Sequence, residues 1–359
     1  MTDDPRPPRE QGKVPREFLE GVVFANLGAK RSSVLVGPGQ GLDNTIISLG
    51  GRKVLVVTSD PLSVIPSIGL KESAWLSIHL LASDLSTSGV EPQFAMLDLN
   101  LPPKMDLESV GAYVTAISDE CRRLGIAIVG GHTGRYPGSD YTVVGGGMMF
   151  SVADGEAYVT PAMANPGDAV LITKGAAIGT AAVLGRAFPS TIGSKIGDAL
   201  LKKAQSRLRD CSTVEDARTA ARLGLRRAVT SMHDATEGGV MGGLFELSAA
   251  CRLSVVVDRE RIHVSEEASA VCRLFGLDPL TSLSEGTLIV TCKPEAVGDL
   301  QSAFSKQGIP SFHVGKIGED RQDTGLWVSS GGSKPVQVEP PASDEYWNAY
   351  SEAVRKGLK

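Results

Sequence analysis

The chain has 359 residues, and its 36 lysines and arginines stand against 41 aspartates and glutamates, which gives a formal net charge of −5. Hydrophobic residues make up 42% of the sequence and the mean hydropathy is +0.01, so the chain has enough apolar material for two globular domains. The sequence has no long basic run. Because contacts with nucleic-acid phosphates need clustered lysine and arginine, we expect no nucleic-acid partner.

The first residues and the cysteines indicate the compartment. Residues 1–16 are rich in proline, arginine and aspartate, and we expect a flexible arm there. This stretch lacks the apolar core of a signal peptide, and no apolar run elsewhere approaches the length of a membrane span. The five cysteines show no CxxC spacing, which favours buried thiols over a structural zinc site. We therefore expect a cytoplasmic protein with no membrane partner.

Strands and helices alternate in the first half of the chain. Asp106 is typical of a helix N-cap and Gly125 of a helix end. The glycines at 145–147 indicate close backbone approach within a strand. The expected elements are a strand at 54–58, a helix at 71–88, a strand at 94–99, a helix at 106–125, and strands at 126–129 and 141–151.

A turn cluster at 161–168 separates an expected first domain, 17–160, from a second, 161–330. Residues 331–359 are polar, and we expect a tail there with one short helix at 345–355. The pattern as a whole predicts an α+β fold. In the second domain we expect strands at 169–173, 253–257, 287–291 and 312–317, and helices from 179 and at 195–209, 214–229, 238–251, 265–275 and 294–306.

Three aspartates stand where an ordered element meets a loop. Asp43 follows the glycine-rich stretch 36–42, Asp60 follows the apolar run 54–57, and Asp84 lies at the end of a helical pattern. Magnesium binds through a few carboxylates plus substrate phosphates, and the N–H groups of a glycine-rich loop can cradle those phosphates. The pattern predicts a metal–nucleotide site. For each aspartate alone, a helix cap or a turn is an equally physical interpretation.

The order of these motifs resembles a known family. Gly-x-Asp-x-x-Ile-Ile at Asp43, Val-Thr-Ser-Asp at Asp60 and Ser-Asp-Leu-x-x-x-Gly-Val-Glu-Pro at Asp84 are followed by Ile-Val-Gly-Gly-His-Thr at 128–133. A second cluster, Met-His-Asp-Ala-Thr-Glu-Gly-Gly, spans 232–239. The ordered set is similar to the AIR-synthase (PurM-like) superfamily, and within it to HypE-like AIR synthase-related proteins, over about residues 30–320.

The resemblance implies a fold, cofactors and a partner. Each half is expected to have an antiparallel-rich sheet with helices on one face, and ATP to bind between the amino-terminal halves of a homodimer. Asp43, Asp60 and Asp84 match positions that ligate Mg²⁺ or orient ATP. The resemblance further implies cofactor-binding roles for Gly37, Gly39, Gly41, Gly130, Gly131, Thr133, Thr236, Gly238 and Gly239.

His132 stands where many superfamily members have an acid. A neutral imidazole is a poor ligand for Mg²⁺ beside oxygen donors, so the metal complement can differ from that of acid-bearing relatives. His132 is a candidate catalytic residue that hydrogen-bonds a phosphate or transfers a proton. A turn histidine satisfied by backbone is the alternative.

His233 and Asp234 are the other candidate catalytic residues. They precede a predicted helix, and the helix N-terminus with Gly238 and Gly239 is typical of an anion site for a transferred phosphate. Alternatively, Asp234 or Thr236 is simply the N-cap of that helix.

The resemblance predicts an ATP- and Mg²⁺-dependent enzyme that phosphorylates an amide, carbamoyl or similar oxygen of a small molecule and so activates it for dehydration or ligation. HypE itself ends in a cysteine-bearing tail, whereas this chain has no cysteine after Cys292. The acceptor is therefore open. Two alternatives remain: a small-molecule kinase of the thiamine-monophosphate kinase type, and a non-catalytic nucleotide-binding maturation scaffold.

Overall fold

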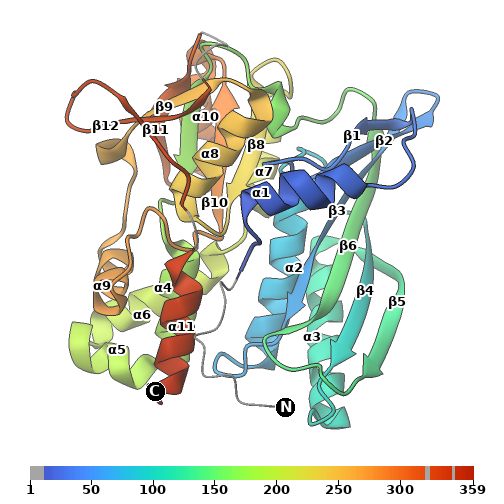
Figure 1. The fold of residues 1–359 in the computed structure, drawn as a ribbon, viewed down its shortest axis with the longest axis vertical. Helices are drawn as coiled ribbons and strands as arrows, with labels where there is room; N and C mark the ends of the chain where they lie inside the picture. The colour runs from blue at the N-terminus through green and yellow to red at the C-terminus, as the bar shows by residue number, and fades with distance from the viewer. Residues whose placement is uncertain (1–11, 320–323, 342–343) are drawn as a thin grey trace.

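The computed structural model describes residues 12–319, 324–341 and 344–359. It contains two sheets that share no strand, one from each half of the chain (Figure 1). The α+β class predicted from the sequence is confirmed. Most of the expected 1–16 arm lies outside the described residues, which begin at Gly12.

The first sheet has six strands, and all neighbours are antiparallel except β4 and β5, which run parallel. In spatial order its strands are β1 (Val34–Val36), β2 (Thr45–Gly50), β3 (Lys53–Ser63), β6 (Val143–Asp154), β4 (Phe94–Leu101) and β5 (Ala127–Arg135).

Two long helices, α2 (Leu70–Ser86) and α3 (Leu107–Leu124), cover one face of this sheet and form its core (Figure 1). The predicted ends of α3 are confirmed, because the Asp106 side chain accepts a hydrogen bond from the Ser109 N–H and Gly125 adopts the left-handed C-cap conformation. On the other face Met96 and Met148 lie opposite each other in the register and are each more than two-fifths exposed. This outer face is apolar and carries no described helix.

The second sheet has seven strands and is also mostly antiparallel; β12 and β9 are its one parallel pair among the described strands. In spatial order its strands are β13 (Val336–Val338), β12 (Gly325–Ser329), β9 (Ser254–Asp258), β11 (Ser311–Ile317), β7 (Ala169–Thr173), β10 (Thr287–Cys292) and β8 (Val229–Ala235).

Helices pack on both faces of the second sheet, which extends the expectation of one covered face. One core lies between the sheet and α8 (Gly239–Cys251), and another lies on the opposite face against α7 (Val214–Ala221) and α10 (Val297–Lys306). The sheet is therefore covered on both sides, and strands β7 and β10 are buried along their whole length. A third cluster joins α4 (Ile178–Ala187), α5 (Pro189–Ile196), α6 (Asp198–Ser206), α9 (Glu266–Phe275) and α11 (Glu345–Arg355).

Three expected elements differ from the structure. The helix expected at 195–209 is divided at Gly197, whose positive φ of 86° breaks the helical path between α5 and α6. The helix expected at 214–229 ends at Ala221, and the chain then turns into β8. Residues 336–338, expected in a polar tail, form strand β13 and pair with β12. No described helix combines the length and the apolar character that crossing a bilayer requires.

Replacement of Leu81 by alanine tests the core of the first half. Leu81 is fully buried on α2, and its methyl groups pack where a side chain on Gly147 would otherwise stand. We expect Leu81→Ala to lower the free energy of unfolding by about 2–5 kcal/mol, measured by urea denaturation. Leu107→Ala is the matched control, because Leu107 is 72% exposed. Equal effects of the two substitutions would contradict this packing.

Candidate active site

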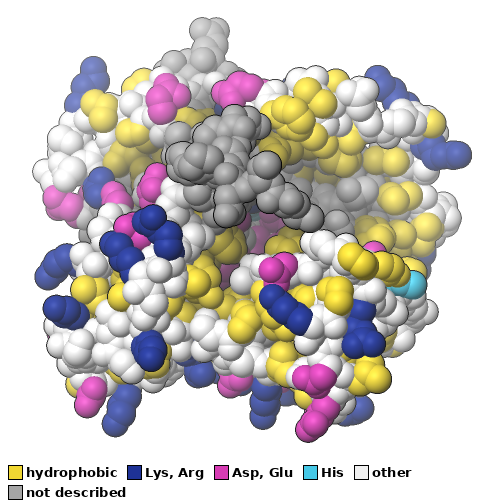
Figure 2. Space-filling view, turned by 60° about the horizontal axis from the view of Figure 1, so that its bottom comes forward, with side chains coloured by type: hydrophobic (Ala, Val, Ile, Leu, Met, Phe, Trp, Pro, Cys, Tyr) yellow, Lys and Arg dark blue, Asp and Glu magenta, His cyan; other side chains and the backbone are white. Residues whose placement is uncertain are grey.

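The two halves enclose a cleft of about 1620 Å³. Strand β3 and helix α2 line it from the first half, and β8 and α8 line it from the second. The segment from Gly12 to Glu20 and helix α11 complete its rim. Figure 2 shows acidic side chains at the bottom of a hollow in the middle of one face. The cleft is thus a site with an acidic interior, built by distant parts of the chain.

The glycine-rich loop that carries Asp43 lies directly on helix α8. Gly41 has a φ of +69°, and a Cβ at this position would collide with the main-chain oxygen of Glu246. Only glycine combines that backbone conformation with so close an approach. The contact fixes the loop so that the Asp43 carboxylate turns toward β8.

Asp60 and Asp84 reach the same cleft from two further elements. Strand β3 continues to Ser63, so Asp60 lies within the strand rather than at its end, and Asp84 lies in the last turn of α2. The Thr58 hydroxyl ties these elements together, at 2.8 Å from the Asp43 main-chain oxygen and 3.3 Å from Asp84 Oδ2. The three aspartates therefore converge, as their motif order suggested.

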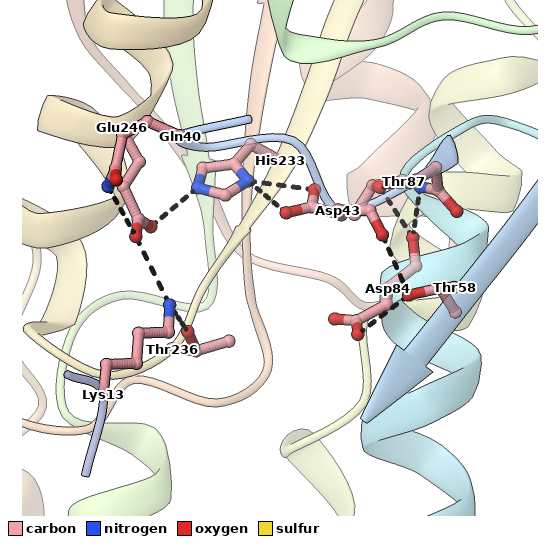
Figure 3. A network of polar contacts seen from close by, with 10 residues as sticks. Lys13, Gln40, Asp43, Thr58, Asp84, Thr87, His233, Thr236 and Glu246 are labelled. Atoms are coloured by element: carbon pink, nitrogen blue, oxygen red, sulfur yellow. Dashed lines mark hydrogen bonds and ion pairs between the residues drawn. The ribbon is translucent and has the colours of Figure 1, made fainter. Parts of the chain in front are cut away.

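His233 joins the two halves from strand β8. Its Nδ1 lies 2.9 Å from the Asp43 carboxylate and its Nε2 lies 3.1 Å from Glu246 Oε2 (Figure 3). Both ring nitrogens face acceptors, so both donate when the ring is an imidazolium. Although burial by itself lowers the pKa of His233, the charge and hydrogen bond of Asp43, together with Glu246, raise it well above its usual value.

Several carboxyl groups in the cleft resist ionisation. Burial raises the pKa of Asp60 to about 6 and that of Asp234 to about 7, with nearby acids adding to both effects. Burial and the neighbouring acids raise the pKa values of Asp84 and Glu285 well above the usual range. Like charges held close together in a low dielectric are the common physical cause. Such a cluster attracts a cation.

The donor set fits a hard divalent cation such as Mg²⁺. Asp234 is 2% exposed on strand β8 and lines the cleft. Ligand atoms of Asp43, His233 and Asp234 lie within 4.8 Å of one another. Because Mg²⁺ takes oxygen ligands and His233 is held by two carboxylates, the aspartates fit a ligand role better than the imidazole does.

The expected anion site at the start of α8 already has an internal carboxylate. The Gly238 N–H donates to Asp344 Oδ2 at 3.0 Å, and Asp344 itself caps α11. A carboxylate at a helix N-terminus is favourable for the same reasons as a phosphate. Thr236, in contrast, faces the cleft beside Lys13.

Six of the expected site residues do not line the cleft. His132 stands on the outer strand β5, where its Nε2 hydrogen-bonds the Tyr136 hydroxyl. Its predicted role would need a second chain at that face, and it stays a prediction. The others outside the cleft lining are Gly37, Gly130, Gly131, Thr133 and Gly239.

The charged residues of the cleft that were not predicted include Lys13, Glu246 and Glu285. Lys13 lies in the stretch expected to be flexible, and Glu246 lies in the middle of α8. Glu285 lies two residues before the start of β10, whose Leu288 pairs with Asp234, so an acid shortly before an apolar strand was its available signal. For Lys13 no sequence pattern marks the site, because its partners Thr236, Glu237 and Glu246 are more than 200 residues away. Glu246 lies 13 residues after His233 and outside the motif at 232–239.

Comparisons with known proteins agree on one family. The model described as AIR synthase related protein, N-terminal domain, matches residues 41–151, and the model of the C-terminal domain matches residues 165–328. Carbamoyl dehydratase HypE of Cupriavidus necator is 28% identical over 254 residues, which are 68% of this chain and 67% of that protein. The same enzyme of Rhizobium leguminosarum bv. viciae is 27% identical over 321 residues, 82% of this chain and 83% of that one.

Solved structures share the fold. A chain in the crystal structure of a HypE–HypF complex has a TM-score of 0.68 and 18% identity, and the match covers 90% of this chain and 99% of that one. AaThiL complexed with AMPPCP and TMP has a TM-score of 0.66 and 18% identity, covering 90% and 97% respectively. These likenesses establish the two-domain architecture.

The raised pKa values predict how stability depends on pH and Mg²⁺. An acid with a raised pKa binds more protons in the folded than in the unfolded state, so stability falls as pH rises from about 4 through about 7. The raised pKa of His233 acts in the same direction above its unfolded value. We expect the Tm without metal to be lower at about pH 8 than at about pH 5.5. Added Mg²⁺ should raise the Tm more at the higher pH.

Differential scanning fluorimetry over a pH series, with and without Mg²⁺, measures both effects. Asp60→Asn removes one of the repelling charges, so it should raise the metal-free Tm at the higher pH by roughly 2 °C and weaken the response to Mg²⁺. Asp154→Asn, at an exposed surface pair, is the control. A Tm that rises with pH and ignores Mg²⁺ would rule out a cation-binding acidic cluster.

Proposed function

Because this chain belongs to the AIR synthase related protein family, we propose that it is an ATP- and Mg²⁺-dependent enzyme that phosphorylates an amide, carbamoyl or similar oxygen of a small molecule. The phosphorylated oxygen then becomes a leaving group for dehydration or ligation. The observation that carries the proposal is the convergence of Asp43, Asp60, Asp84 and Asp234 from both halves in one cleft.

The chemistry matches what the cleft provides. Phosphoryl transfer depends on positioning and on neutralising charge, mostly through metal ions, rather than on covalent help from the protein. Bound Mg²⁺ would supply that neutralisation, and Asp43, Asp60 and Asp84 would hold it. The loop at Gly39 and Gly41 would place backbone N–H groups near phosphates. His233 orients the Asp43 carboxylate and holds the glycine-rich loop next to strand β8.

The relatives give the acceptor class. Two of them are named carbamoyl dehydratase, which favours a carbamoyl or amide oxygen. In this chain the last segment along the cleft is α11, whose Tyr346, Trp347 and Tyr350 line the cleft and which contains no cysteine. These aromatic side chains line the cleft, so we propose that they contact a small-molecule acceptor.

A kinase remains the second candidate. AaThiL, which shares the fold, is complexed with the ATP analogue AMPPCP and with TMP. In that alternative the phosphate stays on the product. Analysis of the product by mass spectrometry separates the two outcomes.

We propose a homodimer through the outer face of the first sheet. The face is open and apolar, and an exposed apolar patch of this kind marks an interaction site. Hydrophobic side chains gather on the right-hand side of Figure 2, the side of the first sheet. Pairing of two such faces would bring strand β5, with Gly130, Gly131 and His132, against a second chain. A reducing, cytoplasmic location is supported by all five cysteines being free.

The proposed activity is tested by ATP turnover. We expect purified protein with Mg²⁺ to convert ATP to ADP when a cell metabolite extract supplies the acceptor. Asp60→Asn and Asp84→Asn should each lower kcat/KM by about 100-fold or more, because they weaken the hold on the Mg²⁺ that would neutralise the charge of the transferring phosphoryl group. Asp154→Asn should behave as wild type. ATP binding without turnover in any extract would favour the scaffold, and no binding would refute the ATP site.

The dimer is tested by replacing one outward methionine. Met148→Glu places a charge in the centre of the outer face and should convert a dimer to a monomer in light scattering coupled to size exclusion. Glu108→Gln, on helix α3 away from this face, is the control. A wild-type monomer at micromolar concentration would contradict the proposed interface.

A further inference from the structure

Lys13, near the start of the chain, is held in place by Glu237, which in turn is held by Trp347 near the end of the chain. Its backbone N–H donates to Glu237 Oε2 at 2.7 Å, and the other oxygen of Glu237 accepts the indole N–H of Trp347 at 2.9 Å. Gly12 has a φ of +98°, and a Cβ there would come within 3.0 Å of both Glu237 and Trp347. The hydrogen bond to Glu237 and the close packing of Gly12 therefore hold Lys13 at the rim of the cleft.

The ammonium group of Lys13 is only loosely engaged. Its Nζ lies 3.3 Å from Glu246 Oε1 and 3.4 Å from the Thr236 hydroxyl (Figure 3). Both distances exceed the usual range for a hydrogen bond from nitrogen to oxygen. The side chain is 53% exposed, and an ammonium has three donors. Donor capacity is thus left for another anion.

Charge makes Lys13 distinctive among the described residues of the cleft lining. Arg16 is the other lysine or arginine there, and it is committed to Glu20 at 2.7 Å and to the ring of Phe245. Although burial by itself lowers the pKa of Lys13, the charges of Glu246 and the other cleft acids raise it above its usual value, so the group stays charged.

We propose that Lys13 binds a phosphoryl group in the cleft. Mg²⁺ held by the aspartates would neutralise the acids that now attract Lys13, and the ammonium would then be available to a phosphate group in the same cleft. Lys13 then moves from Glu246 to the phosphate. A lysine is a flexible point charge, which suits such an exchange of partners. The inference rests on the proposed function, because it needs a nucleotide or a phosphorylated acceptor in the cleft.

A structural role makes a different forecast. If Lys13 only neutralises Glu246, its loss would change stability and leave phosphate binding alone. The two readings separate on ligands that differ in phosphate content. The partial exposure of the side chain makes Lys13→Ala compatible with folding, which thermal unfolding checks.

The experiment measures dissociation constants by titration calorimetry with Mg²⁺ present. The ligands are AMPPNP, ADP, adenosine and inorganic pyrophosphate, and the variants are Lys13→Ala, Lys13→Arg and the control Lys53→Ala, a surface lysine paired with Asp154. We expect Lys13→Ala to weaken AMPPNP binding by about 10- to 100-fold, the worth of one charge-assisted hydrogen bond, and to leave adenosine unchanged. Lys13→Arg should recover part of the loss.

The ligand series identifies the source of the phosphate. A loss for AMPPNP that exceeds the loss for ADP places Lys13 at the terminal phosphoryl group, whereas a loss confined to pyrophosphate places it at a free or acceptor-derived phosphate. Both support the inference. Unchanged affinity for all phosphate ligands in folded Lys13→Ala would overturn it. Failure of wild type to bind any of these ligands would instead overturn the proposed function.

Discussion

Repulsion among carboxylates in a shared cleft is the constraint on which the arrangement of this molecule depends. The fold places acids from β3, α2, β8 and the loop before β10 close together, although their like charges repel one another. The fold tolerates this because two rigid sheets with their own cores hold the elements in place. Positive charge then enters from His233 and Lys13, and it limits the repulsion without cancelling it.

His233 both offsets the negative charge of the cleft and links the two halves of the chain. It contacts one carboxylate from each half, so the imidazolium holds the glycine-rich loop against β8. If every acid in the cleft were neutralised by the protein, the fold would be more stable, but the cleft would no longer attract a cation. Strain of this kind at a site, balanced by packing elsewhere, is common where proteins bind ions and substrates.

Much of the fold could be predicted from the sequence, and the reasons differ from element to element. Helix α3 was predicted with both ends because Asp106 and Gly125 act locally. Strand β8 was missed because it is buried on both faces and contains Thr230 and Ser231, so neither alternation nor continuous apolarity marks it. Strand β13 was missed because three residues at a sheet edge carry little pattern.

The site shows the same division. Asp43, Asp60 and Asp84 could be predicted as a group because each sits in a motif of a few residues. Lys13 could not, because its relevance comes from contacts across more than 200 residues. Glu246 could not, because it is a single acid inside α8 and belongs to no motif. The place of Asp344 at the start of α8 also depends on where the end of the chain packs, which no local pattern encodes.

The contact between Gly41 and the main chain of Glu246 has a consequence for how this architecture can change. The loop that prepares the first half for its ligand takes its curvature from a helix of the second half, so the two halves do not vary independently. A chimera that joins the first half of one relative to the second half of another has to reproduce the contact between this loop and helix α8. It also has to reproduce the rest of the surface between the domains. The two halves therefore have to be inherited or exchanged together to keep the site intact, even though each half has its own sheet and its own core.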